Sequence, residues 1–197
     1  MRKQFNDVFI GSNGCGKTTL MIKIIIQYVE YNPEKRVLLL LPDDNEEKFY
    51  EISEIKINEL RSFEGIKKII LDTEKDFLQI IEIYNNPINR FNGLMVCDDL
   101  GVLLTRRPEA ILKLFKRRRQ PNIDFIWSFH GLTTDVPKGF FAYVNRIVLF
   151  QTTDNHEDTC DKISVFFKEA FEQMYFRVQR ESQKNPYYFE EITLKQT

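Results

Sequence analysis

The octapeptide at residues 11–18, GSNGCGKT, constrains the fold more than any other feature, because it fits the pattern G-x-x-x-x-G-K-[ST]. An apolar run of strand length precedes it at 7–11, and a segment of helical spacing follows at 17–31. Glycines allow consecutive backbone N–H groups to turn inward around an anion, and the positive end of a helix dipole reinforces them. The sequence therefore predicts a strand, a phosphate-binding loop and a helix in direct succession.

This loop carries the residue types that bind a nucleoside triphosphate. We expect the phosphates to be surrounded by Gly11, Ser12, Asn13, Gly14, Cys15, Gly16, Lys17, Thr18 and Thr19. The Lys17 ammonium can bridge the β- and γ-phosphates, and the Thr18 hydroxyl can bind Mg²⁺. ATP and Mg²⁺ are therefore the expected ligands. Cys15 is most simply a spacer, although its oxidation or alkylation would crowd the phosphates.

Strand-like runs alternate with helix-like segments along the rest of the chain. The runs lie at 36–41, 66–72, 94–97, 123–129 and 146–150, and the helical segments at 46–60, 76–84, 108–118 and 165–180. Because the runs are almost continuously apolar, they predict strands covered on both faces, as in a parallel sheet between two helical layers. No linker or repeat is visible. We expect one domain over 1–197, with its core at about 5–155 and a C-terminal helix and edge strand within 160–197.

Composition excludes several other classes of protein. The chain has 197 residues, of which 43% are hydrophobic and 17 are Phe, so it can bury a sizeable core and is not disordered. Its apolar runs are far shorter than the roughly 18 residues that a membrane span needs. The first residues contain no stretch of signal-peptide length. Three widely spaced cysteines favour reduced thiols, and we expect a cytoplasmic protein.

A second chemical signal is the apolar run 94–97 followed by Asp98 and Asp99. In ATPases that have such a phosphate-binding loop and a strand ending in two acids, the first acid holds the Mg²⁺ shell and the second polarises the attacking water. We assign these roles to Asp98 and Asp99, respectively. The alternative is a strand that ends in two solvated acids. Asp at the second position is shorter than the commoner Glu.

The third signal is the stretch RRRQPNIDFIWSFHG at 117–131, in which a basic helix end leads into a strand. The strand ends in polar groups, Ser128 and His130. In additional-strand ATPases, which this pattern resembles, such a strand lies beside the phosphate-loop strand and a polar residue at its end senses the γ-phosphate. The resemblance assigns that role to His130, or secondarily to Ser128. A structural histidine is the alternative interpretation.

Four elements in order, GSNGCGKTT, LMVCDD, RRRQPNIDFIWSFH and NRIVLFQTTD, resemble the FtsK–HerA superfamily of DNA-pumping ATPases. Within it the short chain and the Asp-Asp pair are most similar to viral genome-packaging ATPases. The resemblance implies a three-layer RecA-like P-loop NTPase fold of the additional-strand class, in the host cytoplasm or associated with the virion. His130 stands where the family usually has Gln.

The resemblance also implies partners. It predicts a ring, commonly a hexamer, with ATP at each subunit interface, DNA contacted through its phosphates, and a capsid or portal protein as a further candidate partner. An arginine from the neighbouring subunit would stabilise the transition state. The candidates are Arg117, Arg118 and Arg119, followed by Arg106 and Arg107.

Other functions compete with this interpretation. A small nucleotide or nucleoside kinase shares the loop, and its basic lid could resemble the arginine cluster. Assembly ATPases of filamentous-phage or conjugation type are also similar, although the phage enzymes typically carry a membrane span. A nucleotide-bound scaffold would keep Lys17 without DNA-stimulated turnover. The chain contains neither the N-K-x-D motif of GTPases nor an L-S-G-G-Q-like signature of ABC ATPases.

The net charge of −1 conceals a segregation of charge. Residues 106–119 contain seven basic residues and one acidic residue, whereas residues 43–54 contain six acidic residues and one lysine. The acidic run is interpreted as a solvated face. The basic run lies between the acidic pair and the expected sensor strand, which favours a phosphate-facing or intersubunit role. A DNA partner is therefore compatible with the overall charge.

Overall fold

The computed structural model describes residues 4–42, 47–86, 91–101, 108–117, 122–131, 136, 139–163 and 165–194. Its strands are β1 (Asn6–Ile10), β2 (Arg36–Leu41), β3 (Ile66–Ile70), β4 (Gly93–Asp98), β5 (Ile123–Phe129), β6 (Arg146–Phe150) and β7 (Phe189–Thr193). Its α-helices are α1 (Lys17–Tyr31), α2 (Glu74–Asn85), α4 (Pro108–Arg117), α5 (His156–Cys160) and α6 (Val165–Ser182). Short 3-10 turns are η1 (Glu47–Phe49), η2 (Ile57–Glu59) and η3 (Phe140–Tyr143).

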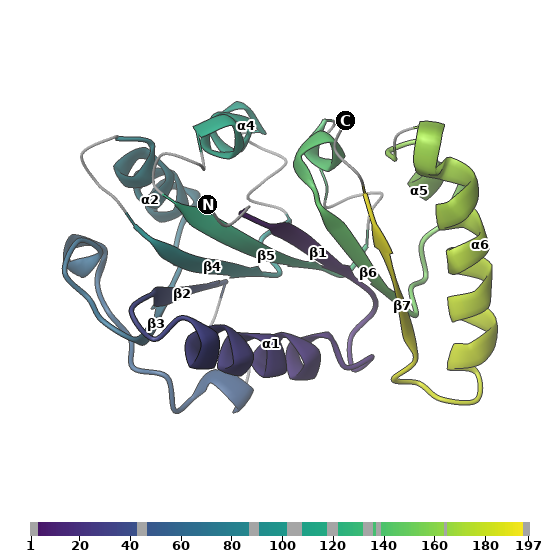
Figure 1. The fold of residues 1–197 in the computed structure, drawn as a ribbon, viewed down its shortest axis with the longest axis horizontal. Helices are drawn as coiled ribbons and strands as arrows, with labels where there is room; N and C mark the ends of the chain where they lie inside the picture. Colours follow the sequence, from purple (N-terminus) through teal and green to yellow (C-terminus); the bar gives the residue numbers. More distant parts are fainter. Residues whose placement is uncertain are drawn as a thin grey trace.

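The strands form one seven-stranded sheet in the order β3-β2-β4-β5-β1-β6-β7 (Figure 1). Strands β1 to β6 are parallel, and β7 pairs antiparallel with β6 at one edge. Strand β5 lies between β1, which leads into the phosphate loop, and β4, which ends in the acidic pair. This insertion is the additional strand that the sequence predicts, and it brings the ends of three functional strands to one edge of the sheet.

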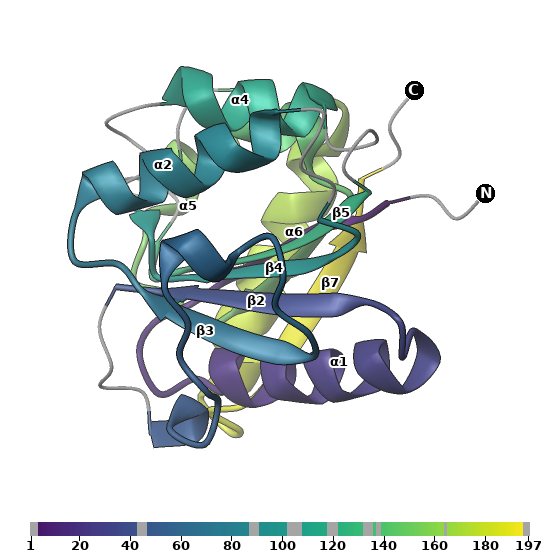
Figure 2. The ribbon, with the colours of Figure 1, turned by 90° about the vertical axis from the view of Figure 1, so that its left-hand side faces the viewer.

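Helices cover both faces of the sheet, which explains why its central strands are apolar on both sides. Helix α1 packs on one face through Met21 and Ile25, whereas α2, α4 and α6 contribute to the larger core on the opposite face. Figure 2 shows α1 on one side of the sheet and α2 with α4 on the other. The predicted three-layer α/β arrangement is therefore confirmed.

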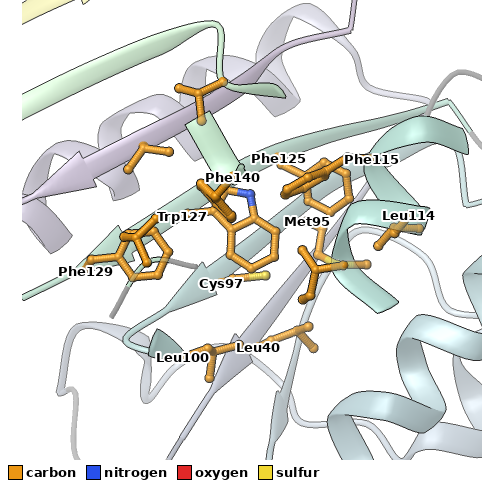
Figure 3. Close-up of a cluster of buried hydrophobic side chains, with 14 of the residues drawn as sticks. Leu40, Met95, Cys97, Leu100, Leu114, Phe115, Phe125, Trp127, Phe129 and Phe140 are labelled. Atoms are coloured by element: carbon orange, nitrogen blue, oxygen red, sulfur yellow. The ribbon is translucent and has the colours of Figure 1, made fainter. Parts of the chain in front are cut away.

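The larger core contains an aromatic cluster centred on Trp127 of β5 (Figure 3). Phe115 of α4 meets the indole edge-on, with ring centroids 5.6 Å apart. Phe140 of η3 makes a similar contact, also at 5.6 Å. The indole Nε1–H donates a hydrogen bond to Asn6 Oδ1 at 2.9 Å, which satisfies the one polar atom of a fully buried ring. This cluster fixes α4 and β1 relative to β5.

The predicted helix over 46–60 is wrong in the part that the structure describes, 47–60, where η1 and η2 are single 3-10 turns. The Ile55 N–H donates to the Lys68 carbonyl, and the Lys68 N–H donates to the Ser53 carbonyl. The segment therefore runs along the outer edge of β3. Its buried residues Phe49, Ile55 and Leu60 do not follow the 3.6-residue period of a helix.

Most other predicted elements agree with the structure. Helix α1 and strands β2, β5 and β6 have the predicted bounds, and α2 and α6 extend somewhat beyond theirs. The C-terminal edge strand is present as β7. Across the described segments, no helix combines the length and the hydropathy that crossing a bilayer requires.

Candidate nucleotide-binding site

The start of the phosphate loop is held between the two strands that flank β1. The Gly11 N–H donates to the Phe129 carbonyl at 3.1 Å, and the Ser12 N–H donates to the Gln151 carbonyl at 2.8 Å. A Cβ at Gly11 would lie 2.6 Å from Phe150 Cβ, closer than side chains pack. Glycine is therefore required at position 11, because the Phe150 side chain leaves no room for a Cβ. The two backbone hydrogen bonds fix the direction in which the loop leaves the sheet.

Two further glycines turn the loop into the helix. Gly14 has φ 75° and Gly16 has φ 99°, both in the left-handed region that favours glycine. Gly16 is the N-cap of α1, and no side chain caps this end of the helix with a hydrogen bond. The first turn of α1 contains no acidic residue. The N–H groups and the positive dipole end of this helix are therefore directed at the site without a competing carboxylate.

Lys17 is buried beneath the loop, with 6% of its surface exposed. Its ammonium donates to the carbonyl oxygens of Gly11 and Ser12, the second at 3.1 Å. The Lys17 ammonium is strongly hydrated in water, and inside the loop these carbonyl oxygens take the place of water molecules as hydrogen-bond acceptors. An anion bound by the loop would therefore lie next to this positive charge.

The acidic pair lies beside the end of the sensor strand, β5. Asp98, the last residue of β4, is buried and lies in register with Ser128 of β5. Asp99 follows with φ 52°, and its N–H donates to the Ser128 carbonyl at 3.2 Å. Its carboxylate Oδ2 lies 2.8 Å from His130 Nε2. The left-handed backbone turns Asp99 out of the strand and toward the histidine, a strained conformation of the kind that functional sites store.

A pocket of about 650 Å³ lies over the phosphate loop and reaches Asp99 and His130. It is lined by Asn13, Gly14, Cys15, Gly16, Lys17, Thr18, Thr19, Leu20, Lys23, Lys48, Asp99, His130, Phe150, Tyr187 and Phe189. Of the two candidate sensors, His130 lines the pocket with 43% of its side chain exposed, whereas Ser128 is fully buried. The geometry therefore favours His130 over Ser128 as the polar group that faces a bound ligand.

The residues present suit Mg²⁺. The Thr18 hydroxyl and the Asp98 carboxylate supply oxygen donors, which Mg²⁺ prefers. Within the described ranges, no group of three or more His, Cys, Asp or Glu side chains could hold a metal by itself.

Six lining residues were not predicted from the sequence. They are Leu20, Lys23, Lys48, Phe150, Tyr187 and Phe189. Lys48 Nζ donates to Thr19 Oγ1 at 3.1 Å, which brings a cation from η1 to the phosphate loop. The sequence does place Phe150 at the end of a strand, but it contains no signal that β6 would flank β1 or that Tyr187 would lie near Gly16.

The side chains of the arginines predicted to act at a subunit interface lie outside the part of the chain that the structure describes, so their roles stay predictions. Arg106, Arg107, Arg118 and Arg119 lie outside the described residues, as does the side chain of Arg117. The same holds for Asp43, Asp44 and Glu46 of the acidic run.

The loop, the inserted β5 and the strand-end acids define a P-loop NTPase fold of the additional-strand class. The chain belongs to the poxvirus A32 protein family, whose family model matches residues 1–167. A comparison with curated proteins gives no match.

Solved structures confirm the fold. The genome packaging NTPase B204 of Sulfolobus turreted icosahedral virus 2, in complex with AMP, has a TM-score of 0.74 at 14% identity, covering 98% of this chain and 94% of that chain. Its complex with AMPPCP has a TM-score of 0.74 at 12% identity, covering 96% and 92%. The cytoplasmic domain of the type VII secretion ATPase EccC from Thermomonospora curvata gives 0.53 at 12% identity, covering 85% and 22%. The predicted resemblance to viral packaging ATPases is therefore confirmed at the level of the fold.

Proposed function

We propose that this protein is an ATP-hydrolysing motor that moves DNA, as the packaging ATPase of a viral genome. The observation that carries the proposal is the position of β5 between β1 and β4. It places Lys17, Asp99 and His130 around one pocket, and that arrangement suits hydrolysis of a phosphate bound by the loop. Membership of the poxvirus A32 protein family and the fold shared with the genome packaging NTPase B204 support the biological role.

Each site residue has a role in this proposal. Lys17 exchanges its loop carbonyls for the β- and γ-phosphates of ATP. Asp99 orients and activates the attacking water, and His130, which contacts Asp99 at 2.8 Å, couples that carboxylate to the γ-phosphate. Thr18 and Asp98 would hold Mg²⁺, which neutralises phosphate charge when bound.

The proposal extends to an assembly. Residues 1–197 would act as one ATPase domain within a ring, commonly a hexamer, and an arginine from 117–119 or 106–107 of a neighbouring subunit would complete each site. Contacts to DNA would be made to phosphates and would be largely independent of base sequence. A capsid or portal protein would be the docking partner, in the host cytoplasm or on the virion.

The test is the ATPase rate with and without DNA, measured together with the mass of the assembly. We expect DNA to stimulate turnover in an oligomer, and Asp99→Asn to lower kcat at least about 100-fold while ATP still binds. Lys17→Ala should abolish ATP binding. The matched control is Glu82→Gln, which neutralises an exposed carboxylate on α2 and should leave the rate unchanged. A strict monomer that phosphorylates nucleotides and ignores DNA would contradict the motor and favour a kinase.

A further inference from the structure

The pocket continues beyond the phosphate loop to an aromatic surface from the C-terminal part of the chain. This surface consists of Phe150, at the end of β6, together with Tyr187 and Phe189. Figures 1 and 2 both show the turn between α6 and β7 beside the start of α1. A Cβ at Gly16 would lie 3.3 Å from Tyr187 Cδ1, so the tyrosine ring stands directly over the loop. Tyr187 is 64% exposed, so its ring is open to a ligand in the pocket.

The surface is held in place without a ligand. Asn185 Oδ1 accepts a hydrogen bond from the Tyr187 N–H at 3.1 Å, and Pro186 lies between them, so the turn that presents the ring is rigid. Phe189 is the cross-strand partner of Phe150, and their ring centroids are 5.1 Å apart. Rings fixed in this way lose little conformational entropy when a flat group binds against them.

The order of the strands indicates which part of a nucleotide would meet this surface. Strand β1 has β5 on one side and β6 on the other. Asp99 and His130 lie on the β5 side, where the terminal phosphate would react. A triphosphate that runs across the loop from that side leaves its nucleoside on the β6 and β7 side, where the aromatic surface lies.

We infer that Tyr187, backed by Phe189 and Phe150, forms the nucleobase subsite and stacks on the purine ring of ATP. The inference rests on the proposed function, because it takes the pocket to bind a nucleoside triphosphate. It adds an affinity-determining contact from the C-terminal turn to a phosphate site near the N-terminus. Stacking of a base on an aromatic ring is a π-face contact, so it contributes to affinity for every base and discriminates little among them.

The test compares a ligand that has a base with one that lacks it. AMPPCP and inorganic tripolyphosphate are titrated calorimetrically into the full-length chain. We expect Tyr187→Ala to weaken AMPPCP binding about 5- to 100-fold, the range that loss of one stacked base gives. Binding of tripolyphosphate should change less than about two-fold, and Tyr187→Phe should keep most of the affinity for AMPPCP because the ring remains.

Two controls separate the possible failures. Tyr31→Ala removes a tyrosine that is 83% exposed at the far end of α1, and it should leave both affinities unchanged. If Tyr187→Ala binds AMPPCP as tightly as wild type, or weakens both ligands equally, the subsite is wrong. Failure of the proposed function gives a different result: the wild-type chain would show the base-dependent difference but no DNA-stimulated hydrolysis.

Discussion

Cys15 lies inside the phosphate loop, where a thiol could make the site sensitive to oxidation, but its surroundings protect it. The side chain is buried, and burial raises the pKa of the thiol above its ordinary value of 9.0, although Lys17 acts in the opposite direction. Because the thiolate is the reactive form, little nucleophile is present at neutral pH. Burial also raises the thiol pKa of Cys97 and Cys160.

We therefore expect iodoacetamide at pH 7.5 to label Cys15 at least about ten-fold more slowly in the native protein than in the urea-unfolded chain. Labelling should accelerate as the pH rises through and above the ordinary value of 9.0. Peptide mass spectrometry measures this site by site, with the unfolded chain as the control. Rapid native labelling of Cys15 with parallel loss of nucleotide binding would show instead that the loop is thiol-sensitive.

Site residues differ in how well the sequence predicts them. The phosphate loop was predictable because its residues are contiguous and their types follow from local backbone geometry. Asp99 and His130 were predictable as strand ends, since parallel strands end at one edge of a sheet. Tyr187 was not, because its place beside Gly16 depends on the pairing of β7 with β6, which no local pattern specifies.

At the scale of elements, β7 is attached to α6 by one bidentate ion pair. The Arg177 guanidinium donates to both carboxylate oxygens of Glu190 at 2.7–3.0 Å. These hydrogen bonds hold the pKa of Glu190 below its ordinary value of 4.5, with a smaller contribution from the Tyr188 hydroxyl and with burial acting in the opposite direction. A carboxyl group with a lowered pKa in the folded state stabilises the fold above its ordinary pKa and loses that contribution as the pH falls.

Glu190→Gln should therefore lower the urea midpoint at pH 7, modestly because the pair is partly exposed. The difference from wild type should shrink as the pH falls below 4.5, where Glu190 in the unfolded chain is already protonated. Urea unfolding at a series of pH values from 7 downward measures it. Glu169→Gln, on an exposed position of α6, serves as the control and should show no such trend. A difference that stays constant with pH would mean that packing, not charge, holds the strand.

The wrong prediction over 46–60 also belongs to this scale. Charged residues such as Glu47, Lys48 and Glu51 favour a helix locally, and the segment is rich in them. The segment instead exchanges hydrogen bonds with Lys68 at the edge of the sheet and buries Phe49. Tertiary contacts therefore outweigh helix propensity, as they commonly do when propensity differences are a few tenths of a kcal/mol per residue.

At the scale of the whole molecule, Trp127 connects three parts of the structure through β5, α4 and η3. Trp127→Phe removes the hydrogen bond to Asn6 and leaves space in a fully buried cluster. We expect a loss of about 1–3 kcal/mol in the free energy of unfolding, from the unsatisfied amide and the smaller ring. Urea denaturation measures it, and Phe176→Leu on the exposed face of α6 should change it little. A loss below about 0.5 kcal/mol, the usual range for surface substitutions, would show that the cluster relaxes around the smaller ring.

The interior position of β1 has a consequence for biosynthesis. Of the seven strands of the sheet, β1 is synthesised first, but its hydrogen-bonded neighbours come much later, since Phe5 and Asp124 are separated by 119 residues and Asp7 and Arg146 by 139. At about 5–20 residues per second, translation leaves β1 without either neighbour for roughly 6–24 seconds. During this time the nascent chain has no clamped phosphate loop, and nucleotide cannot yet serve as a ligand that stabilises folding. A product released early, before β5 is made, would expose an unpaired apolar strand and be a substrate for chaperones or for aggregation.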